Sequence, residues 1–143
     1  VTGKDVILAV LGEIGVGGGT NAVLEFVGSG AEALSVDERL AVANMAVEAG
    51  SETGIFPADE AVRDYLEGRA RAPWAAERSD PDAAFRQSLA IDLRALEPLV
   101  AVPHLPGNVR NVSDVGTVRV DQVYIGNCAN GTMTDGATMV SIV

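Results

Sequence analysis

The sequence predicts an α/β fold, because segments with helical spacing of apolar residues alternate with short apolar segments typical of buried strands. The chain has 143 residues, of which 48% are apolar. That length and composition suffice for one domain with its own hydrophobic core. An apolar fraction near one half also excludes a wholly disordered chain.

The first helix is expected over residues 2–14, where apolar side chains form a broad face and Lys4, Asp5 and Glu13 lie off it. Four glycines in the next five positions, 15–19, end this helix. Residues 22–27 are short and apolar, which predicts a mostly buried strand.

The second helix has the clearest start in the chain, since Ser35 and Glu38 have the spacing of a capping box. It is expected to continue to Ala49 and to stop at Gly50. The predicted apolar positions of this helix are Leu40, Ala43 and Val47. A short strand is predicted at 54–56, and a third helix from Asp59 to about Glu67.

Residues 69–82 predict a solvent-exposed connection, anchored to something apolar by Trp74. Alternation with period two predicts a strand at 89–93, and a further strand is expected at 100–102. Residues 117–125 have the strongest strand pattern, with alternating β-branched side chains.

Charge and apolar patterning exclude several classes of protein. The formal net charge of −10 provides no basic stripe for nucleic-acid phosphates. No apolar run approaches the roughly 18 residues of a membrane span, and no signal peptide is visible. One cysteine cannot form an internal disulfide, so a cytoplasmic location is expected.

The glycine-rich stretch at 15–20 raises the question of a nucleotide site. It lacks the Gly-x-Gly-x-x-Gly pattern and the Lys-Ser or Lys-Thr pair of a P-loop. Its glycines follow a helix and precede a strand, whereas a phosphate site places them before a helix. A tight turn between helix and strand is therefore the preferred interpretation.

Asn44 and Glu48 are four residues apart and share one face of the second helix. A carboxylate and an amide on a helix of small residues are able to orient a hydroxyl or a water in a cleft. Ordinary surface polarity explains the same pattern, and the sequence leaves both interpretations open.

Cys128 follows the strongest predicted strand, where open α/β sheets place ligand sites. A thiolate there suits a soft metal or an iron–sulfur cluster. The chain has no second cysteine, and its one histidine, His104, lies between prolines. Cys128 is therefore either a small buried side chain or one ligand of a site completed from elsewhere. His104 is expected to be a loop residue without a catalytic role.

Several segments, in order, resemble the aconitase superfamily and, within it, the large subunits of the 3-isopropylmalate dehydratase and homoaconitase group. They cover most of the chain and read VTGKDVIL at 1–8, GGT at 18–20 leading to EF at 25–26, NMAVEAG at 44–50, IDL at 91–93 through LEP at 96–98, NV at 108–109 and DQVYIG at 121–126. The resemblance implies a layered α/β/α domain of the aconitase type, present here in part over residues 1–143.

The resemblance also implies a function: a hydro-lyase that isomerises a 2-hydroxy acid by dehydration and rehydration, as in leucine biosynthesis. Cys128 would be one of three thiolates that hold a 4Fe-4S cluster, with two further cysteine ligands outside this chain. Glu48 would contact the hydroxyl or water held at the open iron, Asn44 would help to orient that network, and Asn130 would shape the cluster loop. A small subunit or swivelling domain would supply a serine base, so this internal piece is expected to be inactive alone.

The loop around Cys128 departs from the family pattern Ser-Cys-Thr-Asn-Gly. Asn127 and Ala129 stand where the family has hydroxyl side chains, and such groups tune a cluster through hydrogen bonds. These two residues favour an alternative function, a non-catalytic binding or regulatory module that keeps the fold without the cluster.

Overall fold

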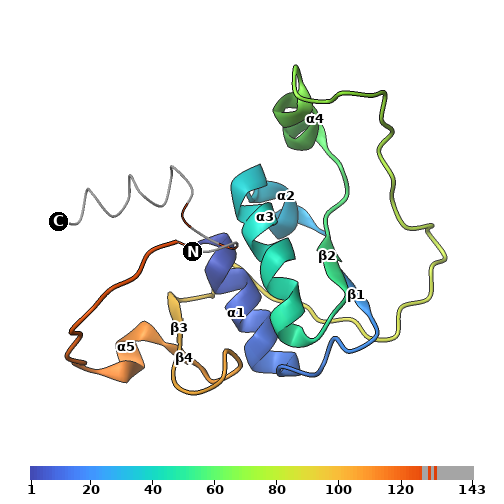
Figure 1. Cartoon of the computed structure of the whole chain (residues 1–143). Helices are drawn as coiled ribbons and strands as arrows, with labels where there is room; N and C mark the ends of the chain where they lie inside the picture. Colours follow the sequence, from blue (N-terminus) through green and yellow to red (C-terminus); the bar gives the residue numbers. More distant parts are fainter. Residues whose placement is uncertain (127–128, 130, 132–143) are drawn as a thin grey trace.

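The computed structural model describes residues 1–126, 129 and 131. Its two longest helices, α1 (Gly3–Ile14) and α3 (Val36–Met45), pack against each other at the centre of the molecule (Figure 1). Strands β1 (Val23–Glu25) and β2 (Thr53–Ile55) pair in parallel on the α3 side. This arrangement confirms the mixed α/β class that the sequence predicts.

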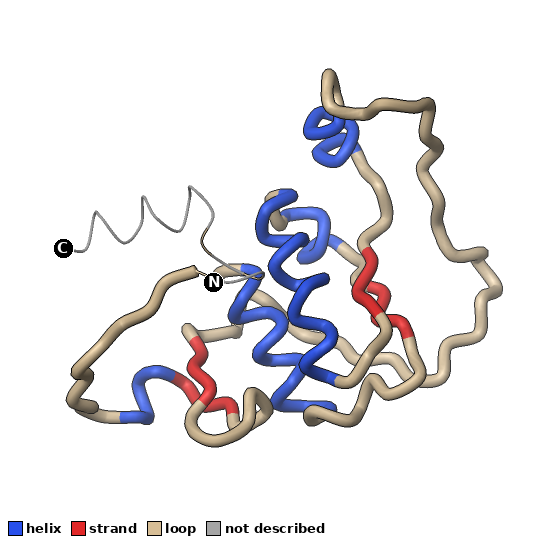
Figure 2. Tube along the Cα trace, in the orientation of Figure 1, coloured by secondary structure: helices blue, strands red, loops and turns tan. Residues whose placement is uncertain are grey.

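A second two-stranded sheet lies against α1. Strands β3 (Leu99–Ala101) and β4 (Val109–Asn111) form an antiparallel pair, with Leu99 opposite Asn111. The strand predicted at 100–102 is thus present with a shift of one residue, whereas β4 was not predicted. The remaining α-helices are short: α2 (Ser29–Ala33), α4 (Glu60–Leu66) and α5 (Val112–Val115) (Figure 2).

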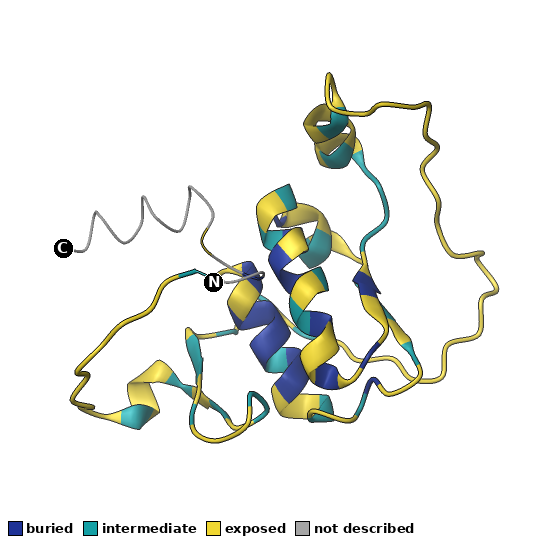
Figure 3. Cartoon of the chain, in the orientation of Figure 1, coloured by how far each residue is buried: buried dark blue, intermediate teal, exposed yellow. Residues whose placement is uncertain are grey.

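Helix α1 is the centre of the hydrophobic core. Its N-cap Thr2 forms a capping box with Asp5, which fixes the start of the helix as the sequence predicts. Five of the seven apolar side chains of the helix are buried, and the buried ones lie on more than one face (Figure 3). The buried core cluster consists of Val6, Ile7, Leu8, Val10, Leu11, Leu34, Val42 and Ala49.

Asp5 is the exception to the predicted polar side of α1, because it is 9% exposed. Its Oδ2 accepts hydrogen bonds from the Thr2 backbone N–H and hydroxyl, and its Oδ1 accepts one from the Leu99 N–H. A buried carboxylate requires such partners. Asp5 therefore joins the start of α1 to strand β3.

The second predicted helix is present, with Ser35 and Glu38 in the expected capping box. It changes character after Met45, where α3 gives way to a 3-10 helix, η1 (Ala46–Ala49). Gly50 ends it with a left-handed φ of 78°, a backbone conformation that glycine adopts without steric cost.

The buried face of this helix is not the predicted one. Leu40 is 49% exposed and Val47 is 63% exposed, whereas Arg39 is buried beside Val42 and Ala46. The Arg39 guanidinium donates to the carbonyls of Leu34 and Glu32 and to the Asp59 carboxylate at 2.7 Å, and it lies over the ring of Phe56. These partners satisfy the buried charge, which periodicity of apolar residues could not reveal.

Helix α4 begins after the N-cap Asp59, close to the prediction for 59–67. The following connection over 69–82 is exposed throughout, as expected. Trp74 is itself 42% exposed, and its anchoring to an apolar surface stays a prediction.

Two predicted strands are wrong. Residues 89–93 are irregular, although Ile91 and Leu93 still pack against the core and Asp92 is exposed. Residues 117–125 are exposed and irregular in the structure. A strand requires a neighbour to hydrogen-bond its backbone, and the described residues provide none for either segment.

Candidate functional site

The candidate residues Asn44 and Glu48 lie at the junction between α3 and η1. Both are exposed, and Leu40 and Val47, on the same side of the helix at helical spacing, are exposed as well. We call these four residues the α3–η1 face. The side chains of the predicted carboxylate and amide are thus both accessible from solvent.

The glycine turn, residues 15–20, holds the end of η1. The Gly19 N–H donates a 2.8 Å hydrogen bond to the Ala49 carbonyl, one residue beyond Glu48. A Cβ on Gly19 would lie 2.8 Å from the Ser51 Cβ and 3.1 Å from the Ala49 oxygen. Glycine is therefore required at position 19 by a close backbone approach. The interpretation of 15–20 as a helix-to-strand turn is confirmed, since the turn links α1 to β1.

A buried hydroxyl supports η1 from within. Ser51 is 4% exposed, and its Oγ donates a 2.9 Å hydrogen bond to the carbonyl of Ala46, the first residue of η1. The bond satisfies a carbonyl at the end of α3 that water does not reach. Ser51 could not be recognised from the sequence, because a serine two residues after a helix end carries no distinctive spacing.

An arginine from the long connection contacts the other side of the glycine turn. The Arg86 guanidinium donates hydrogen bonds to the carbonyls of Gly18 and Thr20, at 2.9 and 3.1 Å. This contact joins two segments that are 66 residues or more apart in the sequence. No local pattern in the sequence predicts so distant a contact for Arg86.

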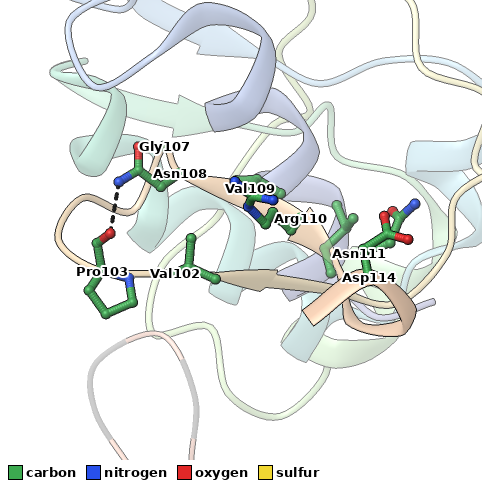
Figure 4. Close-up of a pocket in the computed structure, with 9 residues that line it drawn as sticks. Val102, Pro103, Gly107, Asn108, Val109, Arg110, Asn111 and Asp114 are labelled. Carbon is green, nitrogen blue, oxygen red and sulfur yellow. Dashed lines mark hydrogen bonds between the residues drawn. The ribbon is translucent and has the colours of Figure 1, made fainter. Parts of the chain in front are cut away.

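The hairpin of β3 and β4 borders a cavity of about 720 Å³ (Figure 4). Its polar side chains are Asn108, Arg110, Asn111 and Asp114, and the Asn108 amide donates to the Pro103 carbonyl at 3.2 Å. A second cavity, of about 550 Å³, lies between α1, β1 and residues 85–93. Neither cavity is lined by Asn44 or Glu48.

The other two candidate residues, Cys128 and Asn130, lie outside the described residues. Between them, Ala129 is buried at 6% exposure. His104 is exposed in the loop between β3 and β4. Among the residues that the structure describes, no three His, Cys, Asp or Glu side chains gather in a way that could hold a metal ion. No helix in the same part of the chain is long and apolar enough to cross a membrane.

In the part of the chain that the structure describes, two carboxylates have lowered pKa values, and neither belongs to the α3–η1 face. The hydrogen bond from Arg39 lowers the pKa of Asp59, and the hydrogen bond from Arg94 lowers the pKa of Asp92. Both shifts follow from stabilisation of the charged carboxylate by a guanidinium. The Arg39–Asp59 pair joins α3 to the start of α4, whereas Asp92 and Arg94 form an exposed local pair.

Comparison with known proteins shows to which family this chain is similar. A model of the aconitase family (aconitate hydratase) matches residues 1–143. The chain is 67% identical, over 94% of its length, to the 3-isopropylmalate dehydratase large subunit 2 of Rubrobacter xylanophilus. It is 47% and 46% identical over the same share to the 3-isopropylmalate dehydratase large subunits of Syntrophus aciditrophicus and Moorella thermoacetica. The chain spans 32% of the length of each of these relatives.

Proposed function

The chain belongs to the aconitase family, and we propose that it forms part of the large subunit of a 3-isopropylmalate dehydratase. The observation that carries this proposal is the 67% identity over 94% of the chain to a large subunit of that name. The proposed reaction removes water from a 2-hydroxy acid and adds it back with the hydroxyl on the neighbouring carbon. For isopropylmalate this reaction belongs to leucine biosynthesis.

The chain can supply one thiolate ligand to an iron–sulfur centre. The sequence has one cysteine, and a cluster requires three or four thiolates. Cys128 is therefore proposed as one of three cysteine ligands of a 4Fe-4S cluster, with the other two outside this chain. When bound, such a cluster supplies an open iron that acts as a Lewis acid toward the substrate hydroxyl. Asn130 is proposed to shape the loop around Cys128.

Glu48 is the proposed proton-handling residue of this chain. Its carboxylate is exposed on the α3–η1 face, so a substrate hydroxyl can reach it without rearrangement of the core. As the C–O bond breaks, a carboxyl group there would deliver a proton to the departing hydroxyl. As water adds back, the same group would take a proton up.

Asn44 is the proposed orienting residue, because it lies one helical turn before Glu48. An amide offers both a donor and an acceptor, so it is able to hold a carboxylate and a hydroxyl in one hydrogen-bonded network. The exposed Leu40 and Val47 on the same side provide apolar surface that a neighbouring domain or subunit would cover.

The substrate is proposed to be a hydroxy di- or tricarboxylic acid, with a separate small subunit or swivelling domain supplying the serine base. That base would remove the proton from carbon, while the residues of this chain act at the hydroxyl. This division of roles requires the α3–η1 face to lie at the boundary between the two partners, which its exposed position allows.

The proposal is tested in the full-length protein that contains this chain, reconstituted anaerobically with iron and sulfide and assayed with its small subunit on 3-isopropylmalate. The wild type should acquire the brown absorbance of a cluster and turn over substrate, and Cys128→Ser should abolish both. Glu48→Gln should keep the absorbance and lose about 100-fold or more in kcat. Glu52→Gln, which alters an exposed glutamate four residues further on, is the matched control and should leave kcat unchanged. A colourless, inactive wild type would instead indicate the non-catalytic module.

A further inference from the structure

We propose that Arg86 is a positioning residue for Glu48, acting through the glycine turn. The inference rests on the proposed function, because it concerns the carboxylate to which that function assigns proton transfer. Arg86 does not lie on the α3–η1 face, and its guanidinium hydrogen-bonds the carbonyls of Gly18 and Thr20.

Arg86 makes a pair of hydrogen bonds to the glycine turn. Two nitrogens of one guanidinium donate to two carbonyls on either side of Gly19, at 2.9 and 3.1 Å. A planar guanidinium holds two acceptors in fixed relation, which the single ammonium of lysine cannot do. Arg86 therefore fixes the orientation of the peptide units around Gly19.

The peptide units around Gly19 contact η1. The N–H of Gly19 donates to the Ala49 carbonyl at 2.8 Å, and there is no room for a Cβ between Gly19 and Ser51. At Gly50, an added Cβ would lie 3.0 Å from the Thr20 Oγ1 and 3.2 Å from the Val16 carbonyl. The glycine turn and the end of η1 are thus in direct backbone contact, so a shift of the turn moves Glu48.

The backbone of the glycine turn has wide conformational freedom of its own. Four of its first five residues are glycines, and glycine has the widest choice of backbone conformations. Within the turn, the Gly18 N–H donates a hydrogen bond to the Gly15 carbonyl. The N–H and the hydroxyl of Thr20 both donate to the Gly17 carbonyl. The Gly19 N–H ties the turn to η1, and Arg86 ties it to the connection that follows α4. Removal of that tie is expected to broaden the positions available to η1.

The test is a double-mutant cycle in the full-length protein, cluster-loaded and assayed with its small subunit. Arg86→Ala should lower kcat by about 10-fold with little change in KM, because misplacement of a reacting group reduces the rate of the chemical step. In the Glu48→Gln background, the same change should lower kcat less than about 2-fold, since no proton-handling carboxylate remains to be misplaced. Arg86→Lys should fall between the wild type and Arg86→Ala. Arg78→Ala, which removes an arginine of the same exposed connection, should leave kcat unchanged.

Equal losses from Arg86→Ala in the two backgrounds would overturn the inference while leaving the role of Glu48 intact. An unchanged kcat in Arg86→Ala alone would do the same. If Glu48→Gln retains full activity, the proposed role of Glu48 fails, and the inference fails with it. Should Arg86→Ala not fold, the same cycle with Arg86→Lys decides, since that variant keeps the charge and loses the pair of hydrogen bonds.

Discussion

The Oδ1 atom of Asp5 accepts a 2.9 Å hydrogen bond from the backbone N–H of Leu99, 94 residues further along the chain. The other oxygen of the same carboxylate caps helix α1 through Thr2. One buried side chain therefore sets both the start of the central helix and the place where the β3–β4 hairpin docks. The sequence predicted only that Asp5 lies off the apolar face of this helix, and the structure shows both roles.

Replacement of Asp5 by alanine should destabilise both elements. The change removes a helix cap and leaves the Leu99 N–H without its acceptor, so we expect a loss of about 2–3 kcal/mol in the free energy of unfolding. Amide hydrogen exchange at Leu99 should become at least about 10-fold faster. Asp5→Asn keeps an oxygen for Leu99 and should preserve most of that protection. An unchanged exchange rate in Asp5→Ala would show that the hydrogen bond does not hold the hairpin.

The buried face of α3 is tested by one substitution at two positions. Val42 is fully buried and Val47 is 63% exposed. Val42→Ala should lower the free energy of unfolding of the 143-residue chain by about 2–3 kcal/mol. Val47→Ala should change it by less than about 0.5 kcal/mol. Urea denaturation of both variants measures the difference, and a reversed order would mean that the helix is rotated.

The glycine turn offers a second matched pair. Gly19→Ala places a methyl group 2.8 Å from the Ser51 Cβ, whereas a Cβ at Gly17 meets nothing within 4 Å. We expect Gly19→Ala to cost about 1–3 kcal/mol through overpacking. Gly17→Ala should be neutral or should stabilise by up to about 1 kcal/mol, because it restricts the unfolded chain. Thermal melts that show equal costs for both variants would contradict the close approach at Gly19.

The ion pair of Arg39 and Asp59 predicts a pH dependence of stability. The Arg39 hydrogen bond lowers the pKa of Asp59 in the folded state. The carboxylate therefore adds stability above about pH 4, its pKa when unfolded, and that stability is lost as the pH falls through the lower folded pKa. Compared with Asp59→Asn, the wild type should be more stable at pH 6 and should lose that advantage in acid. If the wild type and Asp59→Asn lose stability equally as the pH falls, the ion pair does not contribute to the stability of the fold.

Local signals in the sequence were enough for the starts of the three predicted helices. These helices begin next to residues 2, 35 and 59, and Gly50 ends the second of them, as predicted. Each effect acts within about one helical turn, between a side chain and nearby backbone groups, so neighbours in sequence suffice to predict it. The structure places Asn44 in α3 and Glu48 in η1, and both residues are exposed.

Contacts between distant segments were decided by the tertiary structure. Residues 117–125 have the strongest strand pattern, yet no strand forms there among the described residues, because a strand depends on a partner that its own sequence does not contain. Periodicity assigned Leu40 to the core and overlooked Arg39, whose burial depends on the distant carboxylate of Asp59. The sequence by itself thus determined the family, the starts of the three predicted helices and the residue types of the candidate site. The tertiary structure alone decided which side of α3 is exposed and which distant groups, such as Arg86, hold the turn behind Glu48, since those choices depend on packing between segments far apart in the chain.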